Sequence, residues 1–115
     1  RASVVAISSS AAETCTKGMC TYAASKAALN AAVKVMGREF LKRYQRVNAI
    51  LPTFVDTPMA VRMDDALGDL DSKVAGQPLG LIAPEQIAYL VEFLISDKSS
   101  YITGACIPVS AGAIF

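Results

Sequence analysis

The stretch Thr21-Tyr22-Ala23-Ala24-Ser25-Lys26 opens a long helical pattern in this chain of 115 residues. The alanine-rich run that follows favours a helix over residues 22–43, because alanine has the highest helix propensity. Apolar residues at three- and four-residue steps give this helix one apolar face, made of Leu29, Val33, Met36 and Phe40. Tyr22 and Lys26 are four residues apart, so we expect their side chains one turn apart on the same side of the helix.

Two short apolar runs flank this helix. Residues 4–7, Val-Val-Ala-Ile, predict a strand that is buried on both faces and ends in three serines. Residues 47–51, Val-Asn-Ala-Ile-Leu, predict the next strand, which Pro52 is expected to stop. Parallel strands need a long crossover connection, so the order strand, helix, strand predicts an α/β fold with a parallel sheet.

The remaining segments extend this pattern. A polar loop is expected over residues 13–19, and the mixed acidic segment 60–76 is expected to leave the sheet edge and return as a flap. Apolar spacing predicts a further helix over residues 84–96, opened by a proline and a glutamate. Residues 102–109 predict a last short strand, and Pro108 indicates the end of a strand or a sheet edge.

Composition narrows the class of protein. An apolar fraction of 53% with 18% charged residues is typical of a soluble α/β protein, and a net charge of +1 gives no reason to expect a nucleic-acid or membrane partner. Cys15, Cys20 and Cys106 match no metal-ligand spacing, so we expect reduced thiols in a cytoplasmic protein. Because the chain begins with Arg1 and enters a strand almost at once, we expect it to belong to a longer protein.

The absence of histidine restricts the chemistry that the chain can perform. It excludes nucleophilic catalysis by a Ser-His or Cys-His pair and metal sites with histidine ligands. The carboxylates of the acidic segment are more typical of a solvated helix face than of a metal site; they are Asp64, Asp65, Asp69 and Asp71. An ammonium group close to a phenol favours the ionised phenol, so a Tyr–Lys pair can exchange protons with a substrate. The spacing of Tyr22 and Lys26 alone is also compatible with a packed tyrosine and a solvated lysine.

The position of the pair strengthens the functional interpretation. The carboxyl ends of two parallel strands lie at the same sheet edge, and ligands of open α/β sheets bind in the crevice beyond that edge. The serines at 8–10 and the segment 52–59 both follow a predicted strand, and Tyr22 at the helix start can fold back over them. The sequence therefore predicts a site at this edge.

Several motifs then occur in a fixed order, and together they resemble the second half of a short-chain dehydrogenase/reductase over nearly the whole chain. The motifs are the serines that end the first strand, Tyr22-x-x-x-Lys26, Val47–Pro52, Thr57-Pro58-Met59, Pro84–Ala88, and Ser96-Asp97 with Tyr101–Gly104. The resemblance implies the C-terminal part of a Rossmann-like doubly wound parallel sheet. Residues 1–115 would then be the C-terminal portion of a single domain whose dinucleotide-binding half is absent.

The resemblance also implies an activity and roles for individual residues. The protein would be an oxidoreductase that uses NAD or NADP to interconvert a small-molecule carbonyl and an alcohol by hydride transfer. Tyr22 would be the general acid or base, and Lys26 would assist it and bind the nicotinamide ribose. The serine that orients the substrate carbonyl would be Ser9, which lies 13 residues before Tyr22, with Ser8 and Ser10 as alternatives. Cofactor contacts would come from Tyr22 and Lys26 and from Pro52, Val55 and Thr57.

The chain departs from the family pattern at three places. Thr53 replaces the usual glycine after Pro52, residues 109–112 replace the usual Asp-Gly-Gly, and no Gly-x-Gly-x-x-Gly turn is present. The resemblance therefore implies that the main cofactor cradle lies outside these 115 residues, which we expect to be inactive alone. It also implies a homo-oligomer, a dimer or a tetramer, and its pattern is the general one of 3-oxoacyl-[acyl-carrier-protein] reductases.

A non-enzymatic interpretation remains beside this one. The chain would then be a catalytically inactive derivative of such an enzyme, acting as an interaction or assembly module. The joint retention of Ser9, Tyr22 and Lys26 favours the enzyme.

Overall fold

The computed structural model describes residues 2–67 and 70–114 of the chain. Its elements, in chain order, are β1 Ala2–Ile7, α1 Ala11–Thr14, α2 Cys20–Glu39, the 3-10 turn η1 Phe40–Arg43, β2 Gln45–Pro52, α3 Pro58–Leu67, α4 Leu70–Ala75, α5 Pro84–Ile95, the 3-10 turn η2 Asp97–Ser99 and β3 Cys106–Val109. Asp69 and the side chains of Asp64 and Asp65, expected on a solvated face, fall outside what is described.

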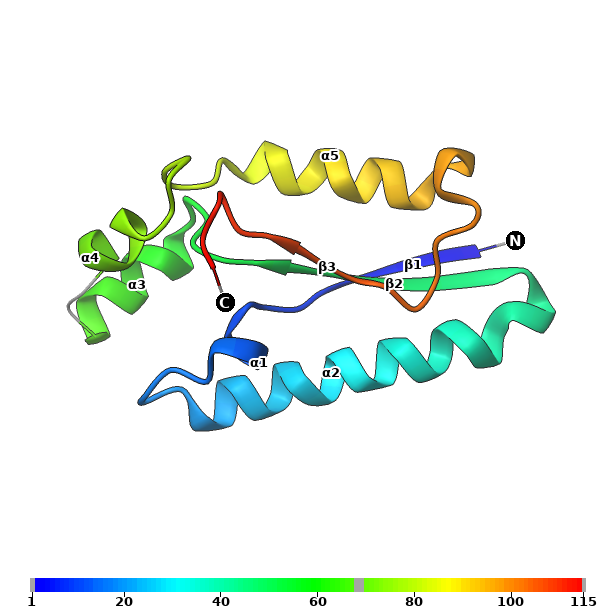
Figure 1. Ribbon diagram of the computed structural model, residues 1–115, viewed down its shortest axis with the longest axis horizontal. Coiled ribbons are helices and arrows are strands. Elements are labelled where there is room, and N and C mark those ends of the chain that lie inside the picture. Colours follow the sequence, from blue (N-terminus) through cyan, green and yellow to red (C-terminus); the bar gives the residue numbers. More distant parts are fainter. Residues whose placement is uncertain (1, 68–69, 115) are drawn as a thin grey trace.

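The three strands form one parallel sheet in the order β1-β2-β3. β2 lies in the centre, with Ile50 opposite Ile7 of β1 and opposite Ile107 of β3. α2 covers one face of this sheet and α5 covers the other (Figure 1). The predicted α/β fold with a parallel sheet is therefore confirmed.

The core lies between α2 and β2. Val33 of the helix is fully buried against Val47, Ala49 and Leu51 of the strand. The other predicted members of the apolar helix face pack around this cluster and are partly buried; they are Leu29, Met36 and Phe40. Burial of a side chain of this size contributes roughly 1.5–3 kcal/mol, so this face attaches the helix to the sheet.

A close backbone approach fixes the far end of α2. A Cβ atom on Gly37 would lie 2.5 Å from the Cα and the N of Gly104, which precedes β3. The Thr103 hydroxyl donates to the Gly37 carbonyl over 3.2 Å and accepts from the Val47 amide over 3.2 Å. The helix can therefore approach this loop only because position 37 has no side chain.

Several predicted boundaries were wrong. The long helix begins at Cys20 and ends at Glu39. The chain then forms the 3-10 turn η1, and Tyr44, with a φ of 53°, leads it into β2. The predicted polar loop at 13–19 begins within the short helix α1. The predicted flap 60–76 is largely helical, in α3 and α4, and its role as a flap stays a prediction.

The last strand is shorter than the predicted 102–109. The Ile102 carbonyl accepts hydrogen bonds from the side chains of Arg46 and Asn48, over 3.2 Å and 2.9 Å. Asn48 Oδ1 also accepts from the Ala105 amide over 3.0 Å. Since side chains of β2 occupy these backbone groups, regular strand pairing starts only at Cys106. Pro108 lies on an edge strand of the sheet, as predicted.

The prediction that the first strand is buried on both faces was also wrong for this chain. Val4 is 51% exposed and Ile7 is 45% exposed. The reason is the position of β1 at the sheet edge, where β2 is its only described strand neighbour. None of the described helices combines the length and apolar character needed to cross a bilayer.

Candidate active site

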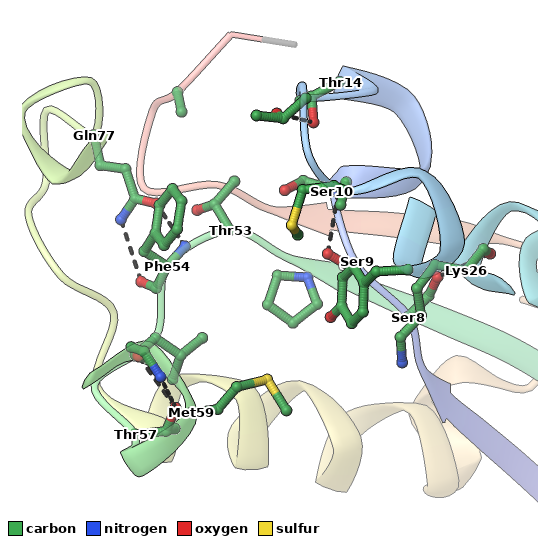
Figure 2. A pocket seen from close by; sticks show the side chains of 18 of the residues that line it. Ser8, Ser9, Ser10, Thr14, Lys26, Thr53, Phe54, Thr57, Met59 and Gln77 are labelled. Carbon is green, nitrogen blue, oxygen red and sulfur yellow. Dashed lines mark hydrogen bonds between the residues drawn. The ribbon is translucent and has the colours of Figure 1, made fainter. Parts of the chain in front are cut away.

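A cavity of about 850 Å³ lies at the carboxyl ends of β1 and β2, beside the first turns of α2. Its lining includes all six residues that the sequence proposed for the site, which are Ser9, Tyr22, Lys26, Pro52, Val55 and Thr57. Figure 2 shows Ser9 and Lys26 on one side of this pocket and Thr57 on the other. The parallel strand–helix–strand arrangement thus brings three separate stretches together, while the chemical roles of the residues stay predictions.

The three serines that follow β1 have different surroundings. Ser8 is buried, and its hydroxyl donates to the Lys26 carbonyl over 3.3 Å, which ties the strand end to α2. The Ser9 hydroxyl accepts from the Ala11 amide over 3.1 Å. Among the described residues it donates to no acceptor, so its proton is available to a ligand. Ser10 also lines the cavity.

Tyr22 and Lys26 lie on the same side of α2, as predicted. Lys26 Nζ is 5.6 Å from the centroid of the Tyr22 ring, within the distance at which a cation is attracted to an aromatic face. The same ammonium group donates to the carbonyl of Ile7, the last residue of β1, over 3.0 Å. These contacts place a phenol and a cation next to the serines at the end of the strand.

The segment that follows β2 forms the opposite wall. Thr57 caps α3, since its hydroxyl accepts from the Ala60 amide over 3.3 Å and Pro58 takes the first helical position. Val55 forms a parallel bridge with Ile82, in which the neighbouring residues make the hydrogen bonds. The N–H of Val55 therefore faces away from Ile82. No acceptor for it occurs among the described residues.

Sequence reasoning missed two contributions to the site. The buried side chain of Gln77 hydrogen-bonds to the backbone of Phe54, and both residues line the cavity. Ala113 and Ile114, near the end of the chain, also reach the cavity. No sequence motif indicates either contribution, because each depends on how a distant segment folds back over the sheet edge.

Thr53, which departs from the family pattern, lies in the wall of the cavity. Its amide donates to the Val109 carbonyl over 3.1 Å, which continues the pairing of β2 with β3. Its Oγ1 is buried and has no hydrogen-bond partner among the described residues. The threonine side chain occupies space at the cavity wall that a glycine would leave empty.

The acidic and thiol side chains that the structure describes form no cluster suited to a metal ion. Among the described residues, no three Cys, Asp or Glu side chains lie close enough together to bind one. The expectation of a site without a metal stays a prediction.

The three thiols are expected to differ in reactivity. Cys15 and Cys20 are exposed, whereas Cys106 is half-buried and its Sγ lies 3.9 Å from the Asn30 carbonyl. Burial raises the pKa of the Cys106 thiol, and the nearby Lys34 opposes this shift only in part. Since the thiolate is the reactive form, Cys106 should react with iodoacetamide at pH 8 at least about tenfold more slowly than the other two. Mass spectrometry of the labelled peptides measures these rates, and equal rates would contradict the prediction.

The parallel sheet, the helices on both faces and the cavity at the carboxyl edge define a Rossmann-like protein. Comparison with known proteins identifies the family. Residues 1–113 match the family model described as enoyl-(acyl carrier protein) reductase. The 3-oxoacyl-[acyl-carrier-protein] reductase FabG of Thermotoga maritima is 37% identical over 98 residues, and the rat (3R)-3-hydroxyacyl-CoA dehydrogenase is 39% identical over 114 residues. This chain belongs to the short-chain dehydrogenase/reductase family.

Solved structures agree with this assignment. The crystal structure of a 3-oxoacyl-[acyl-carrier protein] reductase from Brucella melitensis superimposes with a TM-score of 0.88 and 30% sequence identity. The superposition covers 100% of this chain and 43% of that one. The matches cover 84% of this chain and 39% of the Thermotoga protein, and 97% of this chain and 43% of the rat protein. The chain thus spans about two fifths of the length of these relatives.

Proposed function

We propose that this chain forms the proton-transfer part of the active site of an NAD(P)-dependent oxidoreductase that interconverts a carbonyl and an alcohol. One observation carries the proposal: Ser9, Tyr22 and Lys26 all line a single cavity. Membership in a family of oxidoreductases supports it. The homo-oligomer and the cytoplasmic location expected from the sequence stay predictions.

The residues present fit the nicotinamide end of such a cofactor. The Val55 N–H, unused by described residues, and the Thr57 hydroxyl can hydrogen-bond a carboxamide group, and Pro52 ends the strand below them. Lys26 carries an ammonium group at the end of β1, where it can bind ribose hydroxyls. When bound, NAD(P)H supplies the hydride.

The side chains of this chain would handle the substrate oxygen. In the direction of reduction, the Ser9 O–H donates a hydrogen bond to the carbonyl oxygen and orients it. As the carbonyl carbon is reduced, the Tyr22 hydroxyl gives its proton to the same oxygen, which becomes the alcohol. The Lys26 cation stabilises the phenolate that remains, and solvent returns the proton. The Ser8 hydroxyl already donates to a backbone carbonyl, which supports Ser9 as the orienting residue.

The lining of the cavity supports an apolar substrate. Much of it is apolar and includes Ile7, Met19, Phe54, Met59, Ile87 and Ile114. The names of the Thermotoga and rat relatives both refer to acyl thioesters oxygenated at carbon 3. We therefore propose a 3-oxoacyl thioester as the substrate class.

A spectrophotometric assay tests this function in the protein expressed from the complete reading frame that encodes this chain. Oxidation of NADPH or NADH is followed at 340 nm with acetoacetyl-CoA as the probe substrate. Turnover that depends on both the thioester and the reduced cofactor is the expected result. No turnover, together with no measurable binding of either cofactor, would contradict the proposal and favour the assembly module.

Replacing Lys26 with Met should weaken cofactor binding by about ten- to a hundred-fold. A hydrogen bond from a charged group contributes roughly 1.5–3 kcal/mol, and the methionine side chain keeps the length but loses the charge. The dissociation constant of NAD(P)H, measured by fluorescence titration, checks this result. Lys42→Met is the matched control, because Lys42 is exposed on η1 and away from the cavity. An unchanged dissociation constant for the Lys26 variant would contradict the assigned role.

A further inference from the structure

Gln77 is a buried polar residue in the cavity wall, only 4% exposed. Its Oε1 accepts from the Phe54 amide over 2.7 Å, and its Nε2 donates to the Phe54 carbonyl over 3.3 Å (Figure 2). The Nε2 also donates to the Gly80 carbonyl over 2.9 Å. The Gln77 carboxamide thus binds the N–H and the C=O of Phe54, and also the carbonyl of Gly80 in the turn that Gln77 itself begins. Both N–H groups and the oxygen of the side chain are used.

This arrangement makes the side chain a substitute for a β-strand partner. After Pro52 the chain leaves β2, and the backbone of the segment from Phe54 to Asp56 pairs with Ile82. The Ile82 amide donates to the Phe54 carbonyl over 3.1 Å, and the Asp56 amide donates to the Ile82 carbonyl over 2.8 Å. The Gln77 carboxamide adds a hydrogen bond to each backbone group of Phe54, since its oxygen accepts from the amide and its nitrogen donates to the carbonyl.

The position of Val55 and Thr57 therefore depends on this contact. Phe54 is the residue immediately before Val55, so its orientation sets the direction of the Val55 N–H. Removing the Gln77 carboxamide takes away two hydrogen bonds to the backbone of the half-buried Phe54, each worth about 0.5–1.5 kcal/mol, and this loss favours other conformations of the segment. Because Gln77 lies two residues after the end of α4, the same residue also anchors the return of the chain from the helices α3 and α4 to the cavity.

We propose that Gln77 is a positioning residue for the nicotinamide end of the cofactor, acting through Phe54 on the Val55 N–H and the Thr57 hydroxyl. The inference rests on the proposed function. Gln77 lies outside the family motifs. Its role would be to hold the segment that contains Val55 and Thr57 in the geometry that binds the cofactor.

The test compares the affinities of two ligands for the protein expressed from the complete reading frame that encodes this chain. NAD(P)H contains the nicotinamide end, whereas ADP-ribose, or its 2′-phosphate for a protein that prefers NADP, lacks it. Gln77→Met keeps the size of the side chain and removes its hydrogen bonds. We expect it to weaken NAD(P)H binding about tenfold or more and to leave the affinity for ADP-ribose unchanged within twofold. Hydrogen exchange of the Phe54 amide should become at least tenfold faster.

Two further variants make the outcome decisive. Gln86→Met is the matched control, because Gln86 is exposed on α5, and it should bind both ligands like the unaltered protein. Gln77→Glu keeps an acceptor for the Phe54 amide but turns a carboxylate toward two carbonyl oxygens, so it should lose at least as much NAD(P)H affinity as Gln77→Met. It replaces Gln77→Met if that variant fails to fold.

The possible failures are distinguishable. If the unaltered protein binds NAD(P)H no more tightly than ADP-ribose, the proposed function is wrong and this inference fails with it. If the unaltered protein discriminates between the ligands and the folded Gln77 variants discriminate equally well, only the inference is overturned.

Discussion

Tyr22→Phe is expected to lower the rate of carbonyl reduction by about 10²–10⁴-fold, the usual contribution of a positioned general acid. The variant keeps the aromatic ring that lies beside Lys26 and removes only the hydroxyl that would give the proton. Binding of NAD(P)H should change little, because its contacts are assigned mainly to Lys26 and to the segment after β2. Turnover of acetoacetyl-CoA and fluorescence titration with NAD(P)H measure the two effects separately.

The matched control for this experiment is Tyr101→Phe. Tyr101 is fully exposed and lies outside the cavity lining, so the loss of its hydroxyl should leave both measurements unchanged. Substantial activity of the Tyr22 variant would contradict the role of Tyr22 as proton donor. A parallel loss of cofactor binding would instead show that Tyr22 acts in positioning the cofactor.

Gly37→Ala is expected to reduce the free energy of unfolding by about 3 kcal/mol, the upper end of the usual cost of overpacking. The new Cβ would lie 2.5 Å from two backbone atoms of Gly104, which cannot move aside as a flexible side chain can. To relieve the clash, α2 has to move away from the loop before β3, and the hydrogen bond between Thr103 and the Gly37 carbonyl weakens. Urea unfolding followed by circular dichroism measures the change.

The sign of the stability change on Gly37→Ala shows whether close packing or helix propensity dominates at this position. At an unconstrained helix position, glycine to alanine stabilises by about 0.4–1 kcal/mol. The control Ala28→Gly, on the exposed side of the same helix, should cost only about 1 kcal/mol. Stability of Gly37→Ala equal to or above that of the unaltered protein would show that the helix and the loop do not pack this closely.

Much of the fold could be predicted, because the hydrophobic pattern acts over short distances along the chain. The three- and four-residue spacing from Leu29 to Phe40 predicts a helix with one buried face, and this face packs on β2. Element boundaries were less predictable. The start of β3 depends on Asn48, a side chain of another strand that occupies the backbone groups of Ile102 and Ala105.

The candidate site, like the fold, could be predicted from the sequence only in part. Tyr22 and Lys26 could be paired from their spacing, and their meeting with the serines follows from the rule that parallel strands end at one edge. The distinction between Ser8 and Ser9 could not be made, because it depends on which hydroxyl is already engaged in the folded chain.

By itself, the sequence determined the parallel strand–helix–strand unit and, through motifs that resemble those of the family, six of the residues that line the cavity, because periodicity and motifs are local properties of the chain. Only the tertiary structure decided that Gln77 binds the backbone of Phe54 and that Gly37 has to lack a side chain. These contacts join residues 23 and 67 positions apart in the chain. The physical reason is that a buried hydrogen bond or a backbone clash depends on distances in space, which no pattern along the chain records.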